Sequence, residues 1–135
     1  LMILATIVVA TTAGCTRPVQ PAATGGGPAI AAYMNVTPAE AKDLIDKNPD
    51  LVIIDVSPSY AKGHLPGAVN YYLGDGSLDR AIPTLDKNKK YLVYCHVDSV
   101  AIQGAQKLID AGFAPVYRLE GNYRAWVDAG FPVET

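Results

Sequence analysis

Cys95 is the residue whose type and position point most directly to chemistry. It follows the apolar run Tyr91–Tyr94, and a helix is predicted to begin about five residues later. The backbone N–H groups of such a loop and of the helix N-terminus stabilise a thiolate and favour bound anions. We therefore predict that Cys95 is a reactive nucleophile with a depressed pKa. The alternative is that Cys95 is a small buried hydrophobic residue, as free cysteines commonly are.

Two further polar residues, Asp55 and His64, are expected in structural roles. Asp55 ends the apolar run 51–55, and ligands of an open parallel sheet bind outside the carboxyl ends of its strands. We expect Asp55 to tie loops together by hydrogen bonds, and His64 to lock the turn 63–67. The chain has only two cysteines, too few for a four-thiolate zinc site or a disulfide framework. No metal site is predicted.

The elements that must position these side chains alternate between strand and helix. Continuous apolar runs predict buried strands at 51–55, 91–94 and 116–119, with a short strand near 68–70. Helices are predicted after the capping box 37–40, at 78–85 with a bend or end at Pro83, from about 100 to 112, and at 123–129. Strands separated by helices imply parallel pairing. The predicted fold is α/β: a three-layer open parallel sheet with helices on both faces.

The composition describes one globular domain. The chain has 135 residues, of which 50% are hydrophobic and 18% charged. The net charge is −2 and no basic stripe is visible, so we expect no binding to nucleic acid. The domain is expected at residues 33–135, as a monomer, behind a flexible linker at 16–32 that is rich in Pro and Gly.

Residues 1–15 resemble an export signal. The first 14 residues carry no charge and are too few to span a membrane, which takes about 20. They end in Thr12-Ala13-Gly14-Cys15, which resembles a bacterial lipoprotein cleavage box, although Thr12 departs from its usual pattern. We expect Cys15 to be lipidated and the domain to be exported, periplasmic or on the cell surface. The alternative is a plain secretory signal or an uncleaved anchor with an incidental cysteine.

Several segments of the domain resemble the single-domain rhodaneses, which are thiosulfate sulfurtransferases. These segments are 36–41, 53–56, 60–70, 94–95, 119–126 and 130–133, of which 60–70 (YAKGHLPGAVN) is the most specific. The resemblance implies that Cys95 attacks the outer sulfur of a donor such as thiosulfate and holds it as a persulfide. A thiol acceptor then removes the sulfur. No metal or organic cofactor is implied, because the covalent intermediate splits the transfer into two steps.

The loop after Cys95 departs from the family pattern. The resemblance makes it the substrate-binding loop, with residues His96, Val97, Asp98, Ser99 and Val100. Family loops usually carry glycine where Asp98 stands and arginine where Val100 stands, and arginine supplies a fixed cation and a fork of donors for an oxyanion. We therefore expect weak binding of a dianionic donor, which Val100→Arg and Asp98→Gly would improve. Asp98 or Ser99 is expected to cap the following helix, and His96 either adds positive charge or faces solvent.

Two functions from different classes remain open. The first is a sulfurtransferase or persulfide carrier that uses a small sulfur-containing anion or a persulfide as donor, with Cys95 as the site of transfer. The second is a degenerate module that binds a partner or an anion, or senses oxidants through Cys95, without turnover. A phosphatase is disfavoured because an arginine should close its loop, and neither Val100 nor Ala101 can hold a phosphate.

Overall fold

The computed structural model describes residues 32–135, so the expected signal, Cys15 and nearly all of the linker lie outside the described residues. Five strands form one sheet in the order β1-β5-β4-β2-β3, and every pair is parallel. The strands are β1 (Met34–Val36), β2 (Val52–Asp55), β3 (Val69–Asn70), β4 (Tyr91–Tyr94) and β5 (Val116–Leu119). The parallel sheet of an α/β fold is therefore confirmed. Among the described residues, no helix is long and apolar enough to cross a membrane.

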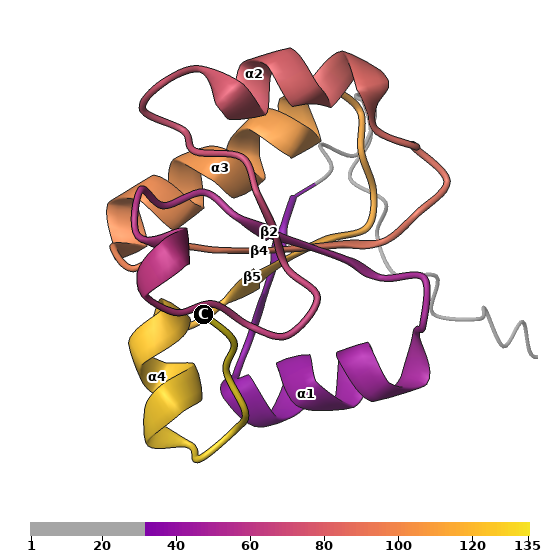
Figure 1. The fold of residues 1–135 in the computed structure, drawn as a ribbon. Coiled ribbons are helices and arrows are strands. Elements are labelled where there is room, and N and C mark those ends of the chain that lie inside the picture. Colours follow the sequence, from indigo (N-terminus) through magenta and orange to yellow (C-terminus); the bar gives the residue numbers. More distant parts are fainter. Residues whose placement is uncertain (1–31) are drawn as a thin grey trace, which may run out of the picture.

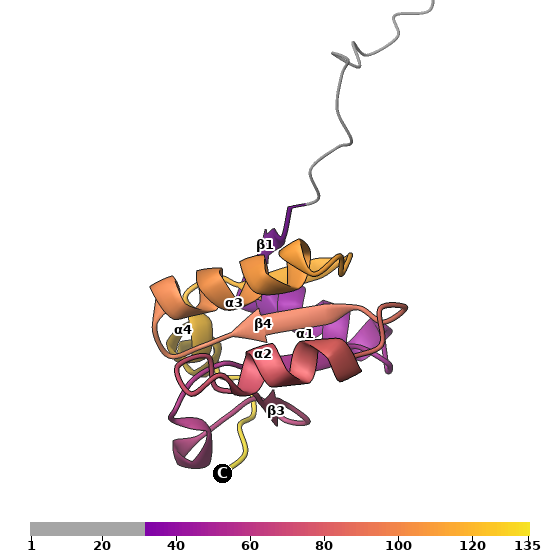
Figure 2. The ribbon, with the colours of Figure 1, turned by 90° about the horizontal axis from the view of Figure 1, so that it is seen from above.

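Four α-helices cover the two faces of the sheet (Figure 1). Helices α2 (Ser77–Ala81) and α3 (Asp98–Asp110) lie on one face, and α1 (Pro38–Lys47) and α4 (Asn122–Asp128) on the other. Short 3-10 turns occupy Tyr60–Lys62 and Ile82–Thr84. Viewed from above, β4 runs through the middle of the molecule, with β1 and β3 on opposite sides of it (Figure 2). The sheet and the helices on its two faces therefore form three layers.

Each face of the sheet has its own hydrophobic core. The core under α3 contains Ala101, Ala105 and Leu108, which recur at helical spacing and are fully buried against the sheet. Gly104 lets this helix approach closely, because a Cβ atom there would lie only 3.1 Å from Cγ1 of Val56. The other core, between the sheet and helices α1 and α4, includes the following buried residues: Val36, Ala41, Ile53, Leu65, Leu92, Tyr94, Leu119 and Trp126.

The structure differs from the sequence-based expectations in three places. Strand β1 was not expected from the sequence, and it pairs with β5 at the edge of the sheet. Helix α2 spans Ser77–Ala81 rather than 78–85, and it continues as a 3-10 turn that contains Pro83, where a bend or an end was expected. Helix α3 begins at Asp98, earlier than the sequence suggested. The last difference shortens the loop after Cys95.

Candidate functional site

Cys95 lies directly after β4, the central strand, and its backbone is held on both sides. Its N–H donates to Oδ1 of Asn122 at 3.2 Å, and its carbonyl oxygen accepts from the N–H of Tyr123 at 3.0 Å. Both partners belong to the first turn of α4. The residue is buried, with 1% of its surface exposed. The turn that opens α4 therefore fixes the place of Cys95 at the carboxyl end of the sheet.

The loop amides act on the Cys95 thiol as expected, but burial outweighs them. Burial raises the pKa of Cys95, whereas the backbone N–H groups of Val97 and His96 lower it, and the charge of Asp55 raises it further. The net result is a pKa above the ordinary value of a cysteine. The expectation of a depressed pKa is therefore wrong, because the thiol is buried while the loop contributes only two N–H groups.

Asp98 does not cap helix α3, contrary to expectation. The N-cap is Val97, no side chain bonds to the cap position, and Asp98 is the first residue of the helix. Oδ1 of Asp98 instead accepts hydrogen bonds from Nη1 of Arg118 and, at 3.0 Å, from Nδ2 of Asn122. Ser99 is exposed and does not cap either; its carbonyl oxygen accepts from Gln103. An ion pair thus stands where a cap was expected.

Arg118 and Asn122 are the two residues near Cys95 that sequence reasoning missed. Arg118 is an almost fully buried cation in β5, and its Nε donates to Oδ1 of Asn35 in β1 at 2.8 Å. Asn122 is also buried and has a positive φ of 56°. A signal for Arg118 was present, because a charged residue inside an apolar strand needs a buried partner. Asn122 follows Gly121 at a turn, and Asn tolerates the left-handed backbone conformation.

The rest of the loop places His96 inward and Val97 outward. The His96 ring stacks on Tyr123 with a centroid separation of 4.3 Å. Nε2 of His96 is buried and has no hydrogen-bond partner among the described residues. Val97 is 56% exposed, whereas Val100 packs against the core under α3. His96 therefore does not face solvent freely, and Val97 is an exposed apolar residue of the loop.

Asp55 holds the loops that follow β2. It is fully buried, and its Oδ1 accepts from the N–H of Ser57 at 2.7 Å. Its backbone carbonyl accepts from Nδ2 of Asn70 and from the N–H of Tyr71, both at 2.9 Å. Its Oδ2 has no hydrogen-bond partner among residues 32–135. These contacts tie the end of β2 to the end of β3 beside the Cys95 loop.

His64 occupies a turn that is joined to the C-terminal segment. Its ring stacks on Tyr60 with a centroid separation of 3.7 Å, and Nδ1 lies 2.9 Å from the carbonyl oxygen of that residue. The backbones of His64 and Glu134 exchange two hydrogen bonds of 2.8 Å. The hydroxyl of Tyr94 accepts from the N–H of Leu65 at 3.0 Å, which joins the same turn to β4. His64 is thus buried among contacts that hold the turn in place.

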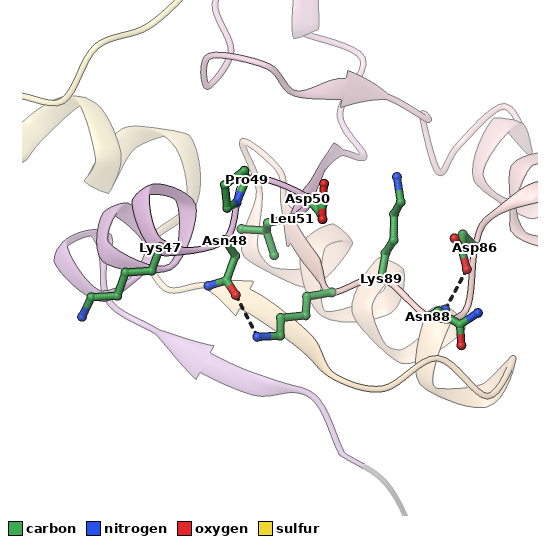
Figure 3. A pocket seen from close by; sticks show the side chains of 9 residues that line it. Lys47, Asn48, Pro49, Asp50, Leu51, Asp86, Asn88 and Lys89 are labelled. Atoms are coloured by element: carbon green, nitrogen blue, oxygen red, sulfur yellow. Dashed lines mark hydrogen bonds between the residues drawn. The ribbon is translucent and has the colours of Figure 1, made fainter.

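A surface cavity of about 440 Å³ lies at the opposite end of the sheet (Figure 3). Its walls are the segments before β2 and β4, where Lys90 Nζ donates to Oδ1 of Asn48 at 2.8 Å. Lysine, asparagine and aspartate side chains line most of it, and no cysteine, serine or histidine is among them. In the part of the chain that the structure describes, no three His, Cys, Asp or Glu side chains are grouped as metal ligands are. Cys95 and its loop are therefore the candidate site.

Comparison with known proteins agrees with this geometry. Residues 37–129 match the model of the rhodanese-like domain family. The chain belongs to the rhodanese-like family. It is 34% identical over 96 residues to the thiosulfate sulfurtransferase GlpE of Coxiella burnetii, a match that covers 70% of this chain and 87% of the relative. The GlpE of Glaesserella parasuis is 24% identical over 102 residues, covering 76% of this chain and 94% of that protein.

Solved structures give the same result for the fold. The crystal structure of the Alr3790 protein from Anabaena sp. superimposes with a TM-score of 0.67 at 30% sequence identity, covering 73% of this chain and 81% of that one. A protein of unknown function from Rhodopseudomonas palustris, described as a possible tyrosine phosphatase, reaches a TM-score of 0.65 at 29% identity, covering 76% and 85%. The chain therefore contains a single rhodanese-like domain that is homologous to the GlpE sulfurtransferases.

Proposed function

We propose that this rhodanese-like domain is a sulfurtransferase that carries sulfane sulfur as a persulfide on Cys95. The observation that carries the proposal is the position of Cys95, a thiol at the carboxyl end of the central strand, directly before the loop that leads into α3. Homology to GlpE sulfurtransferases supports the same reaction class. The sulfur donor and a thiol acceptor are the two substrates.

The reaction has two balanced steps. The Cys95 thiolate attacks the outer sulfur of the donor, the donor S–S bond breaks, and its electron pair leaves with the rest of the donor, as sulfite when the donor is thiosulfate. The thiolate of the acceptor then attacks the outer sulfur of the Cys95 persulfide. The bond between Sγ of Cys95 and the outer sulfur breaks, and its electron pair returns to Cys95, which becomes a thiolate again. The backbone N–H groups of Val97 and His96, which lower the pKa of Cys95, would stabilise the negative charge in both steps.

The loop favours a donor of low charge. Val100 stands where the family usually has an arginine, and it is partly buried against the core under α3. Asp98, at the start of α3, adds a carboxylate whose side chain is 60% exposed. A dianion such as thiosulfate meets no free cation among the loop residues 96–100, so a low-molecular-weight persulfide is the better donor. The sequence of residues 1–15 further supports the proposal that the reaction takes place outside the cytoplasm, with Cys15 as the lipid anchor.

Intact-protein mass spectrometry tests the proposal. A chain that begins at Thr16 keeps Cys95 as its only thiol and is incubated separately with thiosulfate and with glutathione persulfide. We expect a gain of one sulfur atom that is lost again when dithiothreitol is added as acceptor. The control is Cys95→Ala, which should gain nothing. If neither donor adds sulfur, the proposal fails, and oxidation of Cys95 by hydrogen peroxide to a sulfenic acid becomes the measurement that tests the sensor alternative.

A further inference from the structure

A continuous chain of hydrogen bonds runs from β1 to the backbone of Cys95. Arg118 donates through Nε to Asn35 and through Nη1 to Asp98. Asp98 also accepts from Nδ2 of Asn122, and Oδ1 of Asn122 accepts from the N–H of Cys95. The chain joins β1, β5, the first residue of α3, the first turn of α4 and the end of β4.

The burial of Arg118 and Asn122 makes the arrangement specific. Arg118 is 7% exposed and Asn122 is 4% exposed, so neither side chain can replace its partners freely with water. A buried guanidinium is costly unless it is paired, and Asp98 supplies the opposite charge. Oδ1 and Nδ2 of Asn122 are both engaged, which leaves that side chain one orientation in this network. Removing one member therefore disturbs the next.

Arg118 does not replace the arginine that the loop lacks. Arg118 is close to the loop, but its Nε and Nη1 are committed to Asn35 and Asp98. These two nitrogens are therefore not free to bind a donor anion. The charge of Asp98 is in turn directed at Arg118. The pair neutralises both charges and serves to hold the loop.

We propose that Arg118, Asp98 and Asn122 form a clamp that positions the thiol of Cys95 for sulfur transfer. The three are positioning residues, because they act through the backbone of Cys95. The inference rests on the proposed function and adds to it the residues that set the geometry of the nucleophile. Reacting atoms must be held within fractions of an ångström, and a displacement of about 1 Å can cost about 100-fold in rate.

The central variant is Asn122→Gly, which removes both side-chain bonds of the clamp. Glycine adopts the positive φ of 56° without strain, so the variant keeps the fold. We expect the rate of persulfide formation at saturating donor to fall about 10- to 100-fold, with KM within about threefold. We also expect iodoacetamide to alkylate Cys95 several times faster, because the thiol is 1% exposed and a looser loop admits the reagent.

A double-mutant cycle tests whether Asp98 and Asn122 act together. Asp98→Ala and the double variant Asp98→Ala/Asn122→Gly are measured in the same two assays. If the three residues form a clamp, the double variant should be no more impaired than the more impaired of the two single variants, because the first substitution already breaks the hydrogen-bond network. The matched control is Arg124→Gln. It removes an exposed arginine of α4 that pairs with Asp128 and makes no contact in the hydrogen-bond network of the clamp.

The two assays separate failure of the clamp from failure of the proposed function. If the wild-type chain takes up no sulfur from thiosulfate or glutathione persulfide, the sulfurtransferase function fails, and the alkylation rates still decide the clamp. Alkylation of Asn122→Gly within twofold of wild type would overturn the clamp. The clamp would also be overturned if the effects of the two single variants on the rates simply multiplied in the double variant.

Discussion

At the scale of single residues, the Cys95 thiol is subject to two opposing influences. Burial raises its pKa, and the N–H groups of Val97 and His96 lower it by a smaller amount. A thiol of this kind is held mostly protonated at neutral pH, which limits reaction with adventitious oxidants, since the thiolate is the reactive form. The N–H groups remain available for the charge that develops during transfer.

The raised pKa predicts a rising pH profile. Only the thiolate reacts with iodoacetamide, so the alkylation rate of Cys95 should increase with pH and reach its midpoint above about 8.5, the value for a free cysteine. The measurement is the alkylation rate of the chain beginning at Thr16 between pH 6 and pH 11, with Cys95→Ser as the blank. A midpoint below about 8 would contradict the dominance of burial.

The contacts of Asp98 and Val100 give opposite expectations for two substitutions in the loop. Val100→Arg adds a charge-assisted donor and should raise kcat/KM with thiosulfate about 10- to 100-fold, the equivalent of roughly 1.5–3 kcal/mol. Asp98→Gly was expected from the sequence to help as well. It should instead lower activity, because it leaves Arg118 without the carboxylate that neutralises it. Steady-state rates with thiosulfate for both variants measure this, and a gain in Asp98→Gly would contradict the role of the ion pair.

At this scale the sequence predicted positions better than partners. Cys95 and Asp55 were placed near the same end of the sheet because the carboxyl ends of parallel strands share one edge. The bonds of Asp98 with Arg118 and Asn122 depend on how α3 and β5 lie side by side. No local pattern carries that information. The sequence alone therefore favoured a helix N-cap at Asp98, since aspartate is common at that position.

At the scale of elements, Tyr94 links the central strand to the turn 63–67. Its hydroxyl accepts from the N–H of Leu65, and its ring is fully buried in the core under α1 and α4. Burial raises the pKa of Tyr94 far above its usual value, and the charge of Asp55 adds to this. Tyr94 therefore stays neutral, and its hydroxyl satisfies the N–H of a fully buried residue.

Removing this hydroxyl should destabilise the domain. Tyr94→Phe leaves the buried N–H of Leu65 without a partner, which costs about 1–3 kcal/mol in the free energy of unfolding. Urea unfolding followed by tryptophan fluorescence measures the change. Tyr72→Phe, which removes a hydroxyl from a half-buried tyrosine, is the matched control and should change the free energy of unfolding by less. Equal effects of the two variants would argue against the Tyr94 link.

The elements themselves were mostly predictable from the sequence. The apolar runs gave β2, β4 and β5 within a residue, since buried parallel strands are continuously hydrophobic. Strand β1 was missed because it has only three residues and two of them are exposed, so neither length nor alternation marks it. Its place was decided by pairing with β5, which is a tertiary property.

At the scale of the whole molecule, the described domain begins where β1 joins the sheet. Tyr33 packs against the core under α3, and pairing with β5 starts at Met34. The segment 16–32 is rich in Pro and Gly and lacks hydrophobic periodicity. A chain beginning at Tyr33 should therefore have the same melting temperature as one beginning at Thr16. Differential scanning calorimetry of the two chains tests this, and a drop of several degrees would show that residues 16–32 contribute to stability.

The 1% exposure of Cys95 has a geometric consequence for the proposed cycle. A sulfur–sulfur bond is about 2.05 Å long, so the outer sulfur of a persulfide extends beyond the thiol sulfur by up to that distance. Loading would therefore lengthen a buried side chain without any movement of the chain. The outer sulfur of the loaded protein would be more accessible to a second thiol than the thiol of the empty protein is.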